Sequence, residues 1–258
     1  MQHIETDKQI EEKLEERFTI LEVLTHSAMN GESRSLIVSG PPGLGKSYTV
    51  EQALALYDPN ALRHTIAKGY VKPTGLLRLL YKHRAPGQVI VFDDADTIFF
   101  DDTSLNLLKT VCDTTEKRVV SYLAETNMVD EDSAEKIPRS FEFEGTIIFI
   151  TNYDFDAMIQ RGHKLAPHFT ALISRSHYID LAMKSDRDYL IRIKQVVKQG
   201  LLRDLNDNQK ADVLRFVDQN SSRMRELSLR MVLKVASIRK MEMPAWESLA
   251  KVTCCKNK

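Results

Sequence analysis

Apolar and polar positions follow two different patterns along this chain, one before residue 183 and one after it. The first part contains short, continuous apolar runs separated by stretches with helical spacing, and such runs are typical of fully buried strands. The runs cover residues 36–38, 64–66, 89–92, 146–150 and 178–181. Buried strands that alternate with helices predict an α/β core around a parallel sheet. An amphipathic helix is predicted over residues 7–30, ahead of the first strand.

After residue 183 the pattern contains helices only. Apolar residues recur with a period of about 3.6 over 185–197, 206–220 and 228–240, and a shorter segment follows at 244–252. Ser228 is typical of an N-cap for the third of these helices. We therefore predict two domains. Residues 1–182 form the leading helix and an αβα core, and residues 183–258 form an α-helical lid with the C-terminal tail.

A glycine-rich loop lies between the first predicted strand and a helix predicted over residues 48–57. It reads Gly40, Pro41, Pro42, Gly43, Leu44, Gly45, Lys46 and Ser47, and Tyr48 follows it. This is the pattern G-x-x-x-x-G-K-S in the strand–loop–helix context of a P-loop. Glycines let backbone N–H groups turn toward a triphosphate, and the helix N-terminus favours its negative charge. The loop predicts binding of a nucleoside triphosphate, with Lys46 on the β- and γ-phosphates and Ser47 on Mg²⁺.

Polar side chains also follow two of the later strands. Asp93 and Asp94 come directly after the apolar run 89–92, and Asn152 stands at the tip of the run 146–150. Parallel strands deliver such residues to the carboxyl edge of the sheet, where α/β proteins bind ligands. Asp93 is therefore predicted to hold Mg²⁺, directly or through water. Asn152 is either a contact to the γ-phosphate or its water, or a turn-forming residue; beside the other motifs we favour contact.

The composition limits the classes of function and the cellular locations that remain possible. The 36 Lys and Arg balance the 36 Asp and Glu, so no overall field draws the chain to nucleic acid or acidic membranes. No apolar run approaches the ~18–20 residues that cross a bilayer, and the charged first thirty residues do not resemble a secretory signal. Three cysteines, two of them adjacent, suit a reducing compartment. We expect a cytoplasmic protein without a membrane partner.

The motifs and their order resemble the AAA+ ATPase family over about residues 30–243. The resemblance implies a three-layer αβα core whose parallel sheet has the order 5-1-4-3-2, followed by the α-helical lid, with ATP between them. It also implies that Asn152 is the sensor 1 residue, which orients the attacking water. The amino-acid sequence of residues 141–152 also resembles that of small stand-alone ATPases of bacteriophage type.

Two arginine roles follow from the same resemblance. Residues 171–176 resemble the Ser-Arg-Cys segment of clamp loaders, so Arg175 is predicted to be an arginine finger that reaches the site of a neighbouring subunit. Arg161 is a second candidate for that role. The sensor 2 arginine of the lid is assigned to Arg230, with Arg225 as the runner-up. A finger that acts in trans implies a homo-oligomer, and rings of six are the usual form in the family.

The sequence departs from the family at the presumed general base. Asp94 stands where the family usually has Glu, and a base must come within hydrogen-bond reach of the water. Because Asp is one methylene shorter, we expect slow hydrolysis unless the backbone shifts to compensate.

A second departure is the long stretch between Asp93 and Asn152. The residues beyond those needed for a helix and one connection lie at about 118–144. This segment resembles the β-hairpin that some AAA+ clades insert before sensor 1. Acidic residues at its tip disfavour contact with DNA and favour a protein partner or a neighbouring subunit: Asp130, Glu131, Asp132 and Glu135.

Tyr70 lies where AAA+ unfoldases carry an aromatic pore loop, but packing of this tyrosine on its own domain is the favoured explanation. The favoured function is an ATPase that hydrolyses ATP at the subunit interfaces of an oligomeric ring and remodels a protein or nucleoprotein client. One alternative is a DNA-transaction ATPase of the helicase-loader or clamp-loader kind. Another is a nucleotide-dependent assembly switch that hydrolyses ATP slowly.

Overall fold

The computed structural model describes residues 5–123, 128–129, 136–183 and 185–256. These residues divide into two compact units. The sheet unit consists of Phe18–Gly40 and Lys46–Leu181. The lid unit consists of the chain up to Arg17, the segment Pro41–Gly45 and the chain from Ala182 onward.

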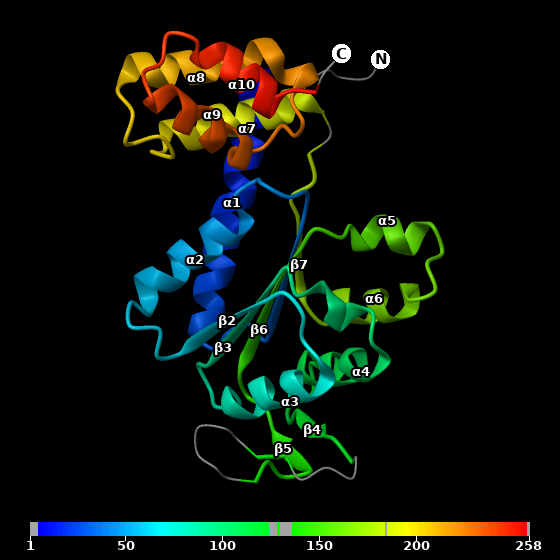
Figure 1. The fold of residues 1–258 in the computed structure, drawn as a ribbon. Helices are drawn as coiled ribbons and strands as arrows, with labels where there is room; N and C mark the ends of the chain where they lie inside the picture. Colours follow the sequence, from blue (N-terminus) through cyan, green and yellow to red (C-terminus); the bar gives the residue numbers. More distant parts are fainter. Residues whose placement is uncertain (1–4, 124–127, 130–135, 184, 257–258) are drawn as a thin grey trace. The chain divides into compact units, whose positions relative to one another are not determined.

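Five parallel strands form the centre of the sheet unit, in the order β2-β3-β6-β1-β7 (Figure 1). Their bounds are β1 Ser35–Ser39, β2 His64–Lys68, β3 Val89–Asp93, β6 Thr146–Thr151 and β7 His177–Asp180. Numbered one to five along the chain and read from the far edge, this order is 5-1-4-3-2. The predicted fold class and strand order are therefore confirmed.

Helices cover both faces of this sheet (Figure 1). The helices after β2, β3 and β6 pack on one face, where Ile90, Phe92 and Phe149 belong to the main apolar core. The part of α1 within the sheet unit and α2 lie on the other face, with Leu21, Val50 and Leu54 buried. The bounds are α1 Asp7–Met29, α2 Lys46–Tyr57, α3 Pro73–Lys82, the 3₁₀ turn Asp96–Phe99, α4 Asp102–Val111, α5 Phe155–Gln160 and α6 Ala166–Ile173.

Two short strands, β4 Val119–Ser121 and β5 Ser140–Glu142, pair in antiparallel fashion between α4 and β6. This pairing confirms the predicted hairpin at its base. The buried ring of Phe141 attaches the hairpin to the core through an edge contact with Tyr81, at 5.2 Å between centroids. The acidic tip residues named above lie outside the described residues.

Four helices make up most of the lid unit: α7 Asp186–Lys198, α8 Asp207–Asn220, α9 Leu229–Lys240 and α10 Trp246–Cys254, with a 3₁₀ turn at Ser221–Arg223. Their apolar faces form a second core around Phe216, Val232 and Trp246. Ser228 caps α9 by accepting a hydrogen bond from the Met231 amide, as its position in the sequence predicts.

The first turns of α1 belong to the lid unit as well. Ile10 and Leu14 pack on Ile191 of α7, and Asp7 pairs with Arg187. Among the residues that the structure describes, no helix is both long enough and apolar enough to cross a bilayer.

Candidate functional site

The residues predicted to hold phosphate meet at the carboxyl edge of the sheet. Gly40 directly follows β1, and Lys46 opens α2. The Lys46 side chain is buried, and its Nζ donates to the Gly40 carbonyl at 2.6 Å and to Oδ1 of Asn152 at 2.9 Å. Because β6 lies beside β1, the asparagine that directly follows β6 comes next to this lysine. The structure therefore brings Lys46 and Asn152 together, as the motifs predict.

Ser47 and Asp93 lie side by side. The Ser47 hydroxyl donates to Oδ1 of Asp93 at 2.7 Å, and Asp93 is buried at the end of β3. A hydroxyl and a carboxylate are hard oxygen ligands, and Mg²⁺ at phosphate sites uses one or two carboxylates together with substrate oxygens. No larger cluster of His, Cys, Asp and Glu suited to a metal occurs in the described parts of the chain. The pair thus fits a magnesium ion that shares its ligands with a nucleotide.

The backbone of Asp94 leaves the strand conformation, with φ of 52°. Aspartate tolerates this left-handed region better than most residues because its short side chain can bond locally. The Asp94 amide donates to the Ile150 carbonyl at 3.1 Å, and its Oδ1 accepts from Nδ2 of Asn152 at 2.8 Å. A continuous path of hydrogen bonds therefore runs from Lys46 through Asn152 to Asp94.

Two residues at this edge were not predicted from the motifs. Lys68, the last residue of β2, places its Nζ 3.0 Å from Oδ2 of Asp93. Asp96 accepts a hydrogen bond from the Thr151 hydroxyl at 2.6 Å, and burial raises the pKa of its carboxyl, with a further rise from Asp94. The position of Lys68 beside Asp93 could have been predicted from the expected sheet order, because in a 5-1-4-3-2 sheet β2 adjoins the acid-bearing strand β3.

Within the lid unit, the loop segment Pro41–Gly45 contacts the start of α9. The Leu229 amide donates to the Gly43 carbonyl at 2.8 Å. Arg230, the predicted sensor 2 residue, directly follows Leu229 and is exposed. Arg225, the runner-up, is also exposed, and its amide donates to the Cys254 carbonyl at 2.9 Å. Arg230 is thus adjacent to a residue that bonds the loop.

A buried arginine that the motifs did not predict also lies beside this loop segment. Arg192 of α7 is 4% exposed, and its Nη1 donates to Gln195 at 2.9 Å. Its Nη2 lies 3.9 Å from the position that a Cβ at Gly45 would occupy. The guanidinium therefore adds positive charge near the glycine loop inside the lid unit.

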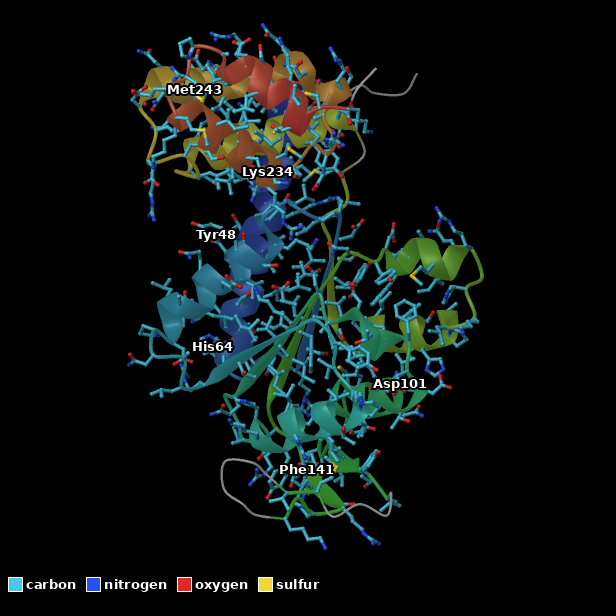
Figure 2. The ribbon with its side chains drawn as sticks, in the orientation of Figure 1. Tyr48, His64, Asp101, Phe141, Lys234 and Met243 are labelled. Atoms are coloured by element: carbon cyan, nitrogen blue, oxygen red, sulfur yellow. The ribbon has the colours of Figure 1, made fainter. Side chains whose placement is uncertain are left out.

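Other predicted residues are exposed. Tyr48 on α2 is 60% exposed (Figure 2), and Tyr70, after β2, is 72% exposed. Such exposure is what gripping a client requires, and it argues against packing of Tyr70 on its own domain. Arg161 is exposed at the C-cap of α5.

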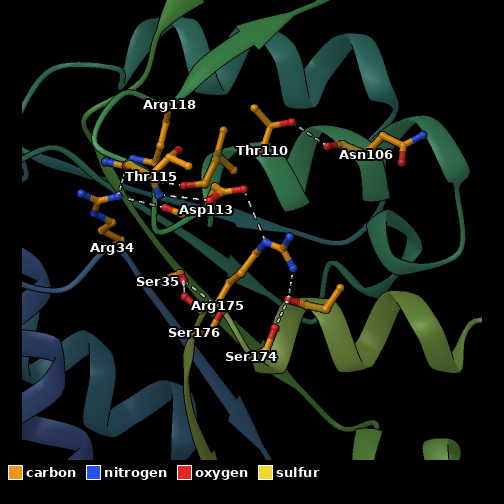
Figure 3. A network of polar contacts seen from close by, with 12 residues as sticks. Arg34, Ser35, Asn106, Thr110, Asp113, Thr115, Arg118, Ser174, Arg175 and Ser176 are labelled. Atoms are coloured by element: carbon orange, nitrogen blue, oxygen red, sulfur yellow. Dashed lines mark hydrogen bonds and ion pairs between the residues drawn. The ribbon is translucent and has the colours of Figure 1, made fainter.

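Arg175 lies in a polar network at the other edge of the sheet (Figure 3). Its Nε is 3.6 Å from Oδ2 of Asp113, and its Nη1 donates to the Ala171 carbonyl at 2.8 Å. The Ser35 hydroxyl donates to the Arg175 carbonyl at 3.1 Å. The amide of Thr115, which donates to Asp113, is the main factor lowering the pKa of that carboxyl, and the charge of Arg175 acts in the same direction. The arginine is thus held by both its side chain and its backbone.

Arg175 and the phosphate loop of the same chain lie at opposite ends of two parallel strands. Arg175 precedes β7, and β7 runs parallel to β1 with His177 opposite Leu36. Gly40 follows the other end of β1. A strand of five residues at about 3.3 Å per residue is roughly 16 Å long, which exceeds the reach of an arginine side chain.

One solved structure agrees with this fold. A RuvB mutant from Thermotoga maritima aligns with a TM-score of 0.51 and 14% identity, over 93% of this chain and 68% of that one. NtrX from Brucella abortus, solved in complex with ADP, aligns with a TM-score of 0.47 and 12% identity, over 86% of this chain and 49% of that one. No protein-family model matches the sequence.

The fold, with its P-loop and acid-bearing strand, is that of the AAA+ P-loop ATPases. A relative in sequence is the uncharacterised 36.7 kDa protein of the nrdC–mobD intergenic region of Enterobacteria phage T4. It is 34% identical over 250 residues, which make up 95% of this chain and 76% of the relative. The chain belongs to the family of that phage protein, in agreement with the phage-type resemblance of residues 141–152.

Proposed function

We propose that this chain binds ATP with Mg²⁺ and hydrolyses it in sites shared between the subunits of a homo-oligomer, with a ring of six favoured. The observation that carries the proposal is the hydrogen-bonded path from Lys46 through Asn152 to Asp94. It links the group expected to neutralise phosphate with the group expected to activate water. Catalysis of phosphoryl transfer rests mainly on such positioning and on charge stabilisation.

Each residue at the sheet edge has a role that its contacts support. The amides of the glycine loop and Lys46 bind the phosphates. Ser47 and Asp93 would hold Mg²⁺, which would supply positive charge to neutralise the phosphates. Asp94 acts as general base toward a water that Asn152 orients. The two side chains are hydrogen-bonded to each other where β3 and β6 end, so a single water can contact both.

The two predicted arginines act from different subunits. Arg175 cannot reach the P-loop of its own chain, so any contact with nucleotide is made in a neighbour, where it would stabilise charge on the transferring group. Arg230 acts in cis, since it follows the residue whose amide bonds to Gly43. Hydrolysis would then depend on how the subunits assemble.

The client is a protein or a nucleoprotein. Tyr70 is exposed and follows β2, which ends beside Asp93, so the loop that carries it starts at the nucleotide edge. An exposed aromatic residue on such a loop is suited to gripping an extended chain through its apolar ring. In this proposal, the state of the nucleotide sets the position of Tyr70.

The test is ATP turnover as a function of protein concentration, for wild type and for Arg175→Ala, with the mass of the ATP-bound species measured in parallel. We expect specific activity to rise with concentration. We expect Arg175→Ala to lose at least about a thousandfold in kcat, the lower range for arginine fingers, while still binding ATP and assembling. Turnover that is independent of concentration and unaffected by the substitution would refute the shared site.

A DNA-dependent role has its own signature. Binding to DNA through phosphate contacts weakens steeply as salt increases, because counterions are released. Strong, salt-sensitive affinity for DNA would replace the protein client by a DNA partner and leave the ATPase proposal in place. Turnover that stays slow in the assembled state would instead favour the assembly switch.

A further inference from the structure

Lys68 lies in direct contact with the carboxylate proposed to hold the metal ion. Sheet register places it opposite Asp93, since β2 and β3 are parallel neighbours and both end at this level. Its Nζ is 3.0 Å from Oδ2 of Asp93 and 2.8 Å from Oε1 of Glu51 on α2. A lysine side chain carries its positive charge at neutral pH, so Lys68 places a cation against both carboxylates.

Both oxygens of Asp93 have partners inside the chain. Oδ1 accepts from the Ser47 hydroxyl at 2.7 Å, and Oδ2 faces the Lys68 ammonium. The Asp93 side chain is only 6% exposed. Magnesium binds carboxylate oxygens at about 2.0–2.1 Å, so it uses the same lone pairs. A dication at that distance would also be repelled by an ammonium group that contacts the same carboxylate.

We propose that Lys68 competes with Mg²⁺ for Asp93 and thereby sets the Mg²⁺ concentration at which the nucleotide site fills. Glu51 makes the exchange feasible, because Lys68 keeps a carboxylate partner when it leaves Asp93. The Lys68 side chain is 57% exposed, so it has room to move. The inference rests on the proposed function in one respect, namely that Asp93 is the metal-binding carboxylate.

The experiment is a Mg²⁺ titration of the whole chain, residues 1–258, loaded with the fluorescent analogue mant-ATP, with the half-saturating free Mg²⁺ concentration as the readout. Lys68→Met removes the competing cation. Lys72→Met removes a charge from an exposed position at the start of α3 and serves as the matched control. Lys68→Arg keeps the charge and should behave like wild type.

We expect Lys68→Met to lower the half-saturating Mg²⁺ concentration about fivefold, the upper range for a partly exposed ion pair. Lys72→Met should remain within twofold of wild type. An unchanged or increased Mg²⁺ requirement in Lys68→Met would overturn the inference. So would an equal decrease in both variants, because the effect would then be one of general charge.

Asp93→Asn separates this inference from the proposed function. If Asp93 binds the metal, this substitution raises the Mg²⁺ requirement and also removes the effect of Lys68→Met in the double variant. If Asp93→Asn leaves the titration unchanged, the metal assignment fails and the inference fails with it. If Asp93→Asn has its effect and Lys68→Met has none, only the competition is refuted.

Discussion

Gly43 offers the most direct test of how the glycine loop meets α9. Its φ is +74°, in the left-handed region, and its carbonyl accepts the Leu229 amide. A Cβ at this position would lie 2.5 Å from Cβ of Ser228 and 3.0 Å from Oε1 of Glu226. Gly43→Ala therefore combines an unfavourable backbone conformation with a steric clash, and both partners of the clash belong to the lid unit.

The two costs are separated by a matched control. Gly162 has nearly the same φ, +67°, and nothing lies within 4 Å of the Cβ that a substitution would add. Gly162→Ala should thus show the conformational cost alone, about 1–2 kcal/mol. Gly43→Ala carries the same cost together with about 1–3 kcal/mol for overpacking. We expect it to lower the free energy of unfolding by about 2–5 kcal/mol.

Urea unfolding of both variants measures these costs, and mant-ATP binding measures the effect on the loop. Because relief of the clash moves the loop, whose amides are proposed to hold the phosphates, we expect Gly43→Ala to bind mant-ATP at least about tenfold more weakly, which corresponds to about 1.4 kcal/mol. Gly162→Ala should bind with unchanged affinity.

The reasoning is refuted if Gly43→Ala unfolds at the same urea concentration as Gly162→Ala. Equal stability would mean that the α9 start does not press on the loop. Loss of stability with full nucleotide affinity would be different evidence: the contact between Gly43 and Ser228 would stand, and the role of the loop in binding phosphate would fail.

Two further substitutions test the polar networks. Asp113→Asn removes the negative charge that pairs with Arg175. We expect kcat to fall two- to fivefold, which corresponds to about 0.4–1 kcal/mol for a partly exposed ion pair. In an Arg175→Ala background the same substitution should leave kcat unchanged, and a further fall there would indicate a structural role for Asp113. Asp96→Asn tests how stability depends on pH. Burial raises the pKa of Asp96 above 3.8, so the folded state binds more protons than the unfolded state. The free energy of unfolding therefore falls as the pH rises from 3.8 through the raised pKa. The Asn variant can still accept a hydrogen bond from Thr151 and lacks this loss. Its stability in urea relative to wild type should therefore increase as the pH rises above 3.8 and then level off, and a constant difference would contradict the prediction.

Much of the fold was predictable because its strands are continuous apolar runs. A run such as residues 146–150 is explained by burial on both faces, and the parallel sheet follows from its alternation with helices. The helices α5 and α6 were not predicted. They have six and eight residues, so each contains too few turns for a 3.6-residue period to be recognised.

The site was predictable where a residue type has few other uses. Lys46 and Ser47 follow from the loop pattern, and Asp93 follows from its place at the end of a buried strand. The contact between Lys68 and Asp93 required the sheet order, since these residues are distant in sequence. The left-handed conformation of Asp94 could not be predicted, because aspartate permits this conformation without requiring it.

That conformation bears on the most evident departure from the AAA+ pattern. Aspartate is one methylene shorter than glutamate, yet the Asp94 carboxylate lies 2.8 Å from Nδ2 of Asn152. The backbone turn at Asp94, held by its bond to the Ile150 carbonyl, carries the carboxylate there. Reach at this position is therefore set by the main chain as well as by side-chain length. Because Asn152 is in turn bonded to Lys46, a phosphate that draws one N–H of Lys46 away would leave the Asn152 oxygen to orient water beside the acid.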